Sequence, residues 1–138
     1  MIVLDVSIVL NWLFPDEDDE LNPVTQDDVN KFGAIVPPLW YYEVANGLLI
    51  GLRRKRIVKA DRDRALILLG RLPIQCDDAL PVLVWQDTSM LADEHKLTAY
   101  DAAYLELAKR RRMPLATLDK ALLKAANKEN IQVMSAGE

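Results

Sequence analysis

Two aspartates stand in unusually apolar surroundings. Asp101 interrupts the apolar run of residues 99–108, and a helix there would place it on the same face as Tyr104. Asp119 follows directly on a second apolar run, residues 114–118. Burial of a carboxylate is costly unless it is hydrogen-bonded or paired with a cation. These positions therefore predict either a specific polar contact or a bound cation.

Two further acids are expected to join them. Asp5 comes directly after Ile2–Leu4, a short apolar run typical of a buried strand, just as Asp119 follows its own run. The carboxyl ends of parallel strands meet at one edge of a sheet, where ligands bind in open α/β folds. Asp101 and Glu43 each fall in the first turns of a predicted helix. We expect all four carboxylates to meet at that edge.

Four carboxylates in one place require a positive charge. Two unit charges 4 Å apart repel by about 4 kcal/mol at an effective dielectric constant near 20. The chain has one histidine, His95, and one cysteine, Cys76, so the ligand set is all oxygen. Hard oxygen ligands favour Mg²⁺ or Mn²⁺, and Mg²⁺ takes one or two carboxylates directly while keeping several waters. The remaining acids would hold those waters or orient a nucleophile.

A metal of this kind suits phosphoryl chemistry, because it offsets phosphate charge and activates water. Eleven of the 17 basic residues lie in two segments, seven in residues 53–64 and four in residues 109–112. Such clusters either hold phosphates or are solvated helix ends. Ser7 and Thr117 lie two residues from Asp5 and Asp119, so they either bond a metal water or phosphate or serve as helix and turn hydroxyls. The combination indicates a nuclease.

Each acid also has a structural explanation. Thr98 and Asp101 match a helix capping box. Asp5 and Asp119 could be N-cap residues, and Glu43 could be an exposed acid favoured by the helix dipole. His95 is most simply a surface or helix-end residue.

The elements that must position these residues alternate between short strands and helices. Strands are predicted at Ile2–Leu4, Ile74–Cys76, Pro114–Leu118 and Ile131–Met134, and Ala34–Val36 before Pro37-Pro38 is predicted as a short edge segment or loop. Helices are predicted over residues 8–14 with Ser7 as cap, 22–33, 40–56, 59–72, 80–96, 99–112 and 119–129. This order predicts one α/β domain over residues 1–138, with three α/β/α layers and a central, mainly parallel sheet.

Composition limits the other possibilities. A chain of 138 residues with a net charge of −4 fits one globular domain and argues against a protein that merely coats nucleic acid. One cysteine excludes an intramolecular disulfide framework. The sequence has no stretch long and apolar enough to span a membrane and does not begin like a signal peptide, so we expect no membrane association and a cytoplasmic location.

With the four acids and their surroundings in this order, the chain resembles the PIN-domain family, specifically the VapC-type toxin ribonucleases of type II toxin–antitoxin systems. The resemblance rests on the segments IVLDVSIVLNWL (2–13), VPPLWYYEVANGLL (36–49), LTAYDAAYLELAKRRRMPLATLDKAL (97–122) and NIQVM (130–134). The acidic run Asp16–Glu20, with the polar stretch after it, departs from the more apolar second helix expected of that family. The resemblance therefore does not predict the helices at the entrance of the site.

The resemblance implies a PIN fold and an endoribonuclease that cleaves RNA phosphodiester bonds with Mg²⁺ or Mn²⁺. Asp5 and Asp101 would be the metal ligands, and Glu43 and Asp119 would complete the site directly or through water. It also implies a homodimer and a small antitoxin partner that reaches into the acidic pocket with a basic side chain.

Two other function classes stay open. A phosphatase of another doubly wound family would also place an aspartate after its first strand, but it would need a second aspartate where this chain has Ser7. A non-catalytic PIN module for RNA or protein binding would gain little from clustered carboxylates.

Several large side chains also have two interpretations. Trp40, Tyr41, Tyr42 and Trp85 could stack on RNA bases or serve as core or interface anchors. Another set of apolar residues is expected in the core or at a partner surface: Ile8, Val9, Trp12, Leu13 and Leu91.

Overall fold

Four short parallel strands form the central sheet. The computed structural model describes residues 1–14 and 20–134. Its sheet has the order β3-β2-β1-β4, with β1 at Ile2–Leu4, β2 at Ala34–Val36, β3 at Ile74–Cys76 and β4 at Leu115–Ala116. Val3 pairs with Ile35 on one side and with Leu115 on the other. β1, β2 and β4 are fully buried, as expected for parallel strands covered by helices on both faces.

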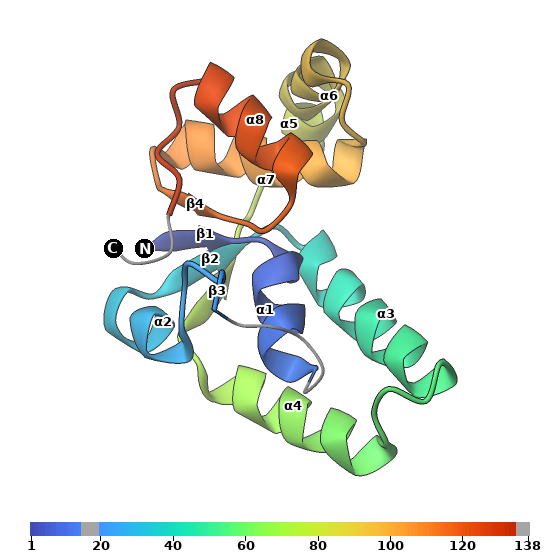
Figure 1. Cartoon of the computed structure of the whole chain (residues 1–138). Coiled ribbons are helices and arrows are strands. Elements are labelled where there is room, and N and C mark those ends of the chain that lie inside the picture. The colour runs from blue at the N-terminus through green and yellow to red at the C-terminus, as the bar shows by residue number, and fades with distance from the viewer. Residues whose placement is uncertain (15–19, 135–138) are drawn as a thin grey trace.

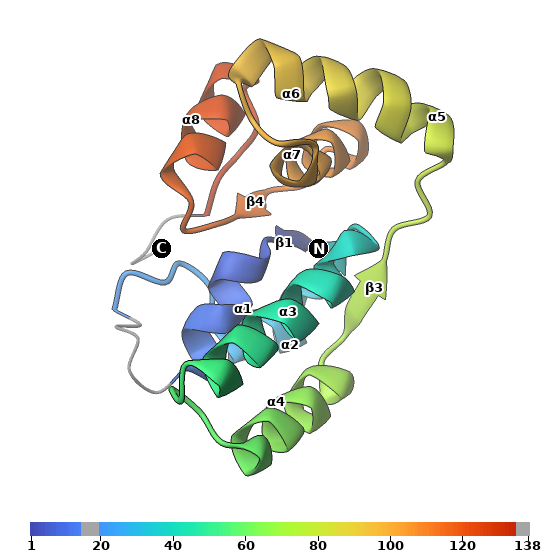
Figure 2. The same cartoon turned by 90° about the vertical axis from the view of Figure 1, so that its right-hand side faces the viewer.

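The helices form a layer on each side of the sheet (Figure 1, Figure 2). One layer contains α1 (Val6–Leu13), α2 (Gln26–Phe32), α3 (Leu39–Arg53) and α4 (Lys59–Arg71). The other contains α5 (Pro81–Leu83), the π-helical segment η1 (Val84–Thr88), α6 (Ser89–His95), α7 (Ala99–Arg111) and α8 (Lys120–Lys128). The prediction of an α/β/α fold with a parallel sheet is confirmed.

Helix α7 is the most deeply buried helix of its layer. Its packed face consists of residues that are almost completely removed from solvent: Ala102, Tyr104, Leu105, Leu107 and Ala108. The helix contacts both β1 and β4. Since Asp101 lies in the first turn of this helix, it is held at a fixed place relative to the strand ends.

Helices α1 and α3 pack closely because α3 has glycines where they meet. A Cβ atom on Gly51 would lie 2.4 Å from the Phe14 ring, and one on Gly47 would lie 2.8 Å from Leu10. Both glycines therefore allow an approach that any larger residue would oppose. This contact fixes α3, and with it Glu43, against the helix that follows Asp5.

The structure corrects several predicted elements. Ala34–Val36 is neither an edge segment nor a loop, because β2 lies between β1 and β3. Its prolines follow the last paired residue and so remove no hydrogen bond from the ladder. Ser7 is not a cap, because α1 begins at Val6 with Asp5 in the N-cap position.

Residues 131–134 are not a full strand in the described chain, where Val133 makes only an isolated bridge to Leu115. The predicted helix 80–96 is divided into α5, η1 and α6. Of the acidic run, residues 16–19 lie outside the described residues, and Glu20 is exposed. Within the described part, no helix is both long and apolar enough to cross a membrane.

Candidate functional site

Helices α1 and α3 begin at the carboxyl edge of the sheet (Figure 1), and the four predicted acids belong to elements that start at or follow the strands at this edge. Asp5 follows β1, and Asp119 follows β4 as the N-cap of α8. Glu43 lies early in α3, which follows β2, and Asp101 lies in the first turn of α7.

Their charges act on one another. Burial is the largest cause that raises the pKa of Asp5, Glu43 and Asp101, and neighbouring carboxylates raise it further. The charge of Asp101 acts on both Asp5 and Glu43, while that of Asp119 acts on Asp101. The fold therefore places these four side chains close enough for their charges to interact, as predicted from the acids that follow the strands.

Asp5 is held through one of its two oxygens. It is 4% exposed, and its Oδ2 accepts hydrogen bonds from the hydroxyls of Ser7 and Thr117, each at 2.6 Å. Ser7 in turn accepts the Leu118 N–H at 2.9 Å, and Thr117 accepts the Asp119 N–H at 3.0 Å. Neither hydroxyl bonds Oδ1, and the Ser7 backbone N–H also acts on this carboxylate. The two hydroxyls therefore leave Oδ1 for a cation.

This network decides the role of the two hydroxyls. Each hydroxyl has one proton, and the contacts to Asp5 use both protons because a carboxylate can only accept. The contact of Ser7 and Thr117 with a metal water or phosphate stays a prediction, since each hydroxyl oxygen has a second lone pair that can accept. They orient Asp5 and fasten the loop from β4 to α8, which carries Asp119.

Glu43 is held by a residue that was not predicted as part of the site. The Tyr104 hydroxyl, from α7, donates to Glu43 Oε1, and Tyr104 is fully buried. In the sequence, Tyr104 could be linked to the site only because it follows Asp101 by three residues, which places both on one helical face. Nothing in the sequence pairs this tyrosine with a glutamate 61 positions away.

The capping explanations hold in part. Asp119 Oδ1 accepts the Leu122 N–H at 2.9 Å, so this carboxylate does cap α8. The Thr98 hydroxyl accepts the Asp101 N–H at 3.1 Å and also interacts with the Asp101 carboxylate, which partly offsets the rise in the pKa of that carboxyl. Asp5 occupies the N-cap position of α1 without a side-chain cap bond. Capping therefore does not account for the side chain of Asp5.

The donor set at this edge fits a hard divalent cation. All donors are carboxylate oxygens, and no described basic side chain forms an ion pair with Asp5, Glu43, Asp101 or Asp119. These four carboxylates do not form a closed metal cage. Among the described residues, the potential ligands that lie within 4.8 Å of one another form a different group. Mg²⁺ needs only one or two direct carboxylates, since it keeps several of its waters.

That closer group consists of Glu94, His95 and Glu129. His95 Nε2 lies 3.1 Å from Glu129 Oε2, and Lys109 Nζ lies 2.7 Å from Glu129 Oε1. The pKa of Glu129 is lowered, first by its hydrogen bond with Lys109. Because Lys109 already neutralises Glu129, we interpret this group as an ion-pair contact that joins α6, α7 and α8.

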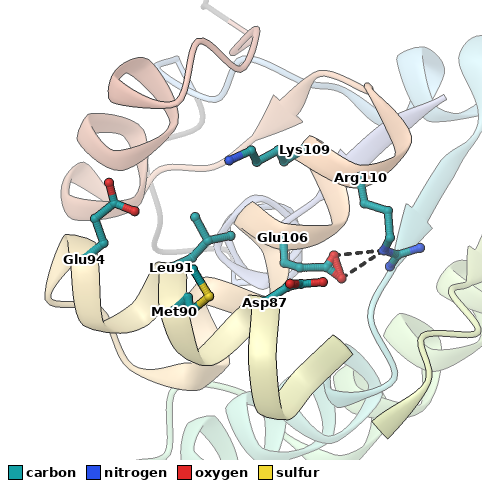
Figure 3. A pocket seen from close by; sticks show the side chains of 7 residues that line it. All are labelled: Asp87, Met90, Leu91, Glu94, Glu106, Lys109 and Arg110. Atoms are coloured by element: carbon teal, nitrogen blue, oxygen red, sulfur yellow. Dashed lines mark hydrogen bonds and ion pairs between the residues drawn. The ribbon is translucent and has the colours of Figure 1, made fainter. Parts of the chain in front are cut away.

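A pocket near this group does not include the four acids (Figure 3). It lies between the η1–α6 segment and α7, and Glu94 stands at one end while the Glu106–Arg110 ion pair stands at the other. It is lined by Asp87, Met90, Leu91, Glu94, Glu106, Lys109 and Arg110.

The basic segment of α7 is engaged within the fold. Asp77 follows β3 and is 3% exposed, and it pairs with Arg110 at 2.5 Å and with Arg111 at 2.8 Å. Burial alone would raise the pKa of Asp77, but the two guanidinium groups lower it overall. Arg110 also pairs with Glu106. These cations therefore balance an acid at the sheet edge that sequence reasoning missed, and they are not free to hold phosphates.

The other basic segment lies at the turn from α3 to α4. Arg53, Arg54 and Lys55 are exposed, and none of them makes an ion pair with a described residue. Arg56 lies over the Phe14 ring, 4.3 Å from its centroid. This turn keeps its positive charge available to solvent.

The aromatic and apolar candidates divide by exposure. Trp40 is core at 3% exposure, whereas Tyr42 and Trp85 are both 79% exposed and Tyr41 is 44% exposed. The second set lies in or against the core: Ile8, Val9 and Leu91 are buried, and Trp12 and Leu13 are partly buried against it.

Comparisons with known proteins can now be set beside this geometry. The model of the PIN domain family matches residues 2–128, which is most of the chain. The chain belongs to the PIN-domain family. No curated protein matches it.

Two crystal structures share the PIN fold of this chain. PAE2754 from Pyrobaculum aerophilum aligns with a TM-score of 0.69 at 23% identity, over 90% of this chain and 83% of that one. FitAcB from Neisseria gonorrhoeae aligns with a TM-score of 0.62 at 20% identity, over 99% of this chain and 98% of that one. At these identities the likeness establishes the fold of the PIN domain and not its activity.

Proposed function

We propose that this PIN domain, a single domain over residues 1–138, is a Mg²⁺- or Mn²⁺-dependent endoribonuclease and the toxin of a toxin–antitoxin pair. The observation that carries the proposal is the set of four mutually repelling carboxylates at the carboxyl edge of the sheet. No described cation offsets these charges, although α7 supplies two arginines to Asp77 nearby. Membership of the PIN family supports a nuclease over a phosphatase.

Asp5 and Asp101 would hold the metal ion directly, and Glu43 and Asp119 would hold it directly or through water. When bound, the ion offsets phosphate charge and makes a water nucleophilic enough for in-line attack on a phosphodiester. The protein's own contribution is orientation. Ser7 and Thr117 fix Oδ2 of Asp5, and neither hydroxyl bonds Oδ1, which would be the oxygen offered to the ion.

The partners follow from the same site. RNA is the proposed substrate, and the uncompensated carboxylates would also accept a lysine or arginine from a small antitoxin. The likeness to FitAcB, which covers nearly the full length of both chains, supports a search for such a partner. We further propose a homodimer in the cytoplasm.

The test is cleavage of total RNA by the purified protein. We expect Mn²⁺-stimulated, EDTA-sensitive cleavage that falls by at least about 100-fold in Asp5→Asn and in Asp101→Asn, because each removes a metal ligand. Asp93→Asn, which alters an exposed acid on α6, is the matched control and should cleave like the wild type.

Two results would contradict the proposal. Unchanged cleavage by either folded site variant would exclude the assigned ligands. Steady phosphate release from a small phosphoester without RNA cleavage would favour a phosphatase.

A further inference from the structure

Three of the four site acids share one arrangement, in which neighbouring groups of the protein hold one oxygen of the carboxylate. In Asp5 the held oxygen is Oδ2, bonded by Ser7 and Thr117. In Asp119 it is Oδ1, bonded by the Leu122 N–H. In Glu43 it is Oε1, bonded by the Tyr104 hydroxyl. Metal-binding carboxylates are typically hydrogen-bonded in this way by groups that fix their orientation.

The Tyr104 hydroxyl has surroundings that fix the direction of its bond. The Val6 backbone N–H and the carboxylates of Asp5 and Glu43 act on the tyrosine oxygen. A tyrosine hydroxyl keeps its proton at neutral pH, because its ordinary pKa is about 10. It therefore donates to Glu43 Oε1, which as a carboxylate oxygen can only accept.

A buried tyrosine hydroxyl needs some partner, and a purely structural contact would satisfy it. Here, however, the partner is an acid of the site carried by a different helix. The bond joins α7, which carries Asp101 in its first turn, to α3, which carries Glu43. It thus connects the two helices that hold two of the four acids.

We propose that Tyr104 is a positioning residue, which holds Glu43 Oε1 so that Oε2 is presented to the metal ion or to one of its waters. This inference rests on the proposed metal-dependent function. Tyr104 would act through Glu43 and would not touch the RNA. Since only its hydroxyl is needed, loss of that one oxygen should weaken metal binding without disturbing the packing of the ring.

The experiment compares Tyr104→Phe with Tyr100→Phe, which removes the same atom from an exposed tyrosine on the same helix. Mn²⁺ binding is measured by calorimetry, and folding by thermal unfolding in EDTA. Loss of a group that orients a metal ligand typically costs 10–100-fold in affinity. We expect Tyr104→Phe to bind Mn²⁺ about tenfold more weakly and Tyr100→Phe to bind like the wild type.

Two further measurements separate positioning from structural damage. Tyr104→Phe should recover cleavage when Mn²⁺ is raised above its new Kd, which a folding defect would not allow. In a Glu43→Gln background, Tyr104→Phe should cause little further loss of affinity, because the carboxylate that it orients is gone. If Tyr104→Phe does not fold, Glu43→Asp replaces it, since the shorter acid withdraws from the hydroxyl and should lose a similar fraction of affinity.

The outcomes distinguish the two proposals. Equal Mn²⁺ affinity in Tyr104→Phe and Tyr100→Phe, with a wild type that binds and cleaves, overturns the positioning role alone. Additive losses in the double variant overturn it as well. A wild type that neither binds Mn²⁺ nor cleaves RNA overturns the proposed function and this inference together.

Discussion

Single carboxylates at the sheet edge carry a free-energy cost when no cation is bound. The folded-state pKa of Asp101 is raised, first by burial and then by the charge of Asp119. Below the unfolded pKa of about 3.9 the side chain is protonated in both states and costs nothing. As pH rises through that value toward the folded pKa, the unfolded state releases its proton first, so the folded state loses stability.

Asp101→Asn should therefore stabilise the metal-free protein at neutral pH and leave its stability nearly unchanged at pH 3. The gain is of the order of 1 kcal/mol at most, because the side chain is partly solvated. Urea unfolding in EDTA at both pH values measures it, with Asp93→Asn as the control. Greater stability of the wild type at pH 7 would contradict the electrostatic account of the site.

Saturating Mn²⁺ should reverse the order of the two proteins. A ligand present at 100 times its Kd stabilises the folded state by about 2.7 kcal/mol. Only the wild type keeps the full ligand set, so only its free energy of unfolding, measured by urea unfolding in Mn²⁺, should rise by this amount.

The positions of these acids were predictable from sequence, but their hydrogen bonds were not. An acid directly after an apolar strand must emerge at the strand's carboxyl end, which is how Asp5 and Asp119 could be placed. The same rule applies to Asp77, but β3 is short and partly exposed, and its arginine partners lie more than 30 positions away. Contacts of that separation, like Tyr104 to Glu43, are products of the tertiary fold.

Among the secondary-structure elements, the contact between α1 and α3 depends most on residue size. Gly51 faces Phe14 and Ile57. A Cβ atom on this residue would lie 2.4 Å from the Phe14 ring and 3.3 Å from Ile57. Arg56 lies over the other side of the contact on the Phe14 ring, which limits how far the ring can move.

We expect Gly51→Ala to destabilise the protein by about 1–2 kcal/mol, because overpacking outweighs the helix propensity gained by replacing glycine. Gly70→Ala is the matched control, since a Cβ atom there meets nothing within 4 Å. That change should be neutral or stabilise by up to about 1 kcal/mol. Equal shifts of the two variants in denaturant unfolding would contradict the packing argument.

The elements themselves were largely predictable because their apolar runs are short and clearly bounded. The incorrect predictions concern segments whose local sequence is compatible with two structures. Pro37-Pro38 favours a strand edge, but here it ends an interior strand, since proline is harmless after the last ladder bond. Residues 131–134 have the composition of a strand, yet the described chain makes one bridge there. Strand pairing depends on partners elsewhere in the chain, which composition does not reveal.

Over the whole molecule, the two basic segments that look alike in sequence have different surroundings. Arg110 and Arg111 balance Asp77, Asp78 and Glu106, so they hold α7 to the end of β3. Arg53 and Arg54 are exposed at the far end of α3, which carries Glu43 near its start. Glu43 and Arg53 are ten residues apart on this helix, or about 15 Å, so the basic turn lies a few nucleotides of RNA from the acids.

This separation predicts that Arg53 and Arg54 add RNA affinity without taking part in cleavage. We expect Arg53→Gln/Arg54→Gln to weaken RNA binding and to reduce the slope of log Kd against log salt by about 1–1.5, since each phosphate contact on a single strand contributes roughly 0.7. Binding is measured in an Asp5→Asn background so that the RNA stays intact.

Lys124→Gln/Lys128→Gln removes the same charge from exposed positions on α8 and is the control. An equal loss in both double variants would mean that net charge alone attracts the RNA, and an unchanged slope in the arginine variant would mean that the RNA does not reach the basic turn.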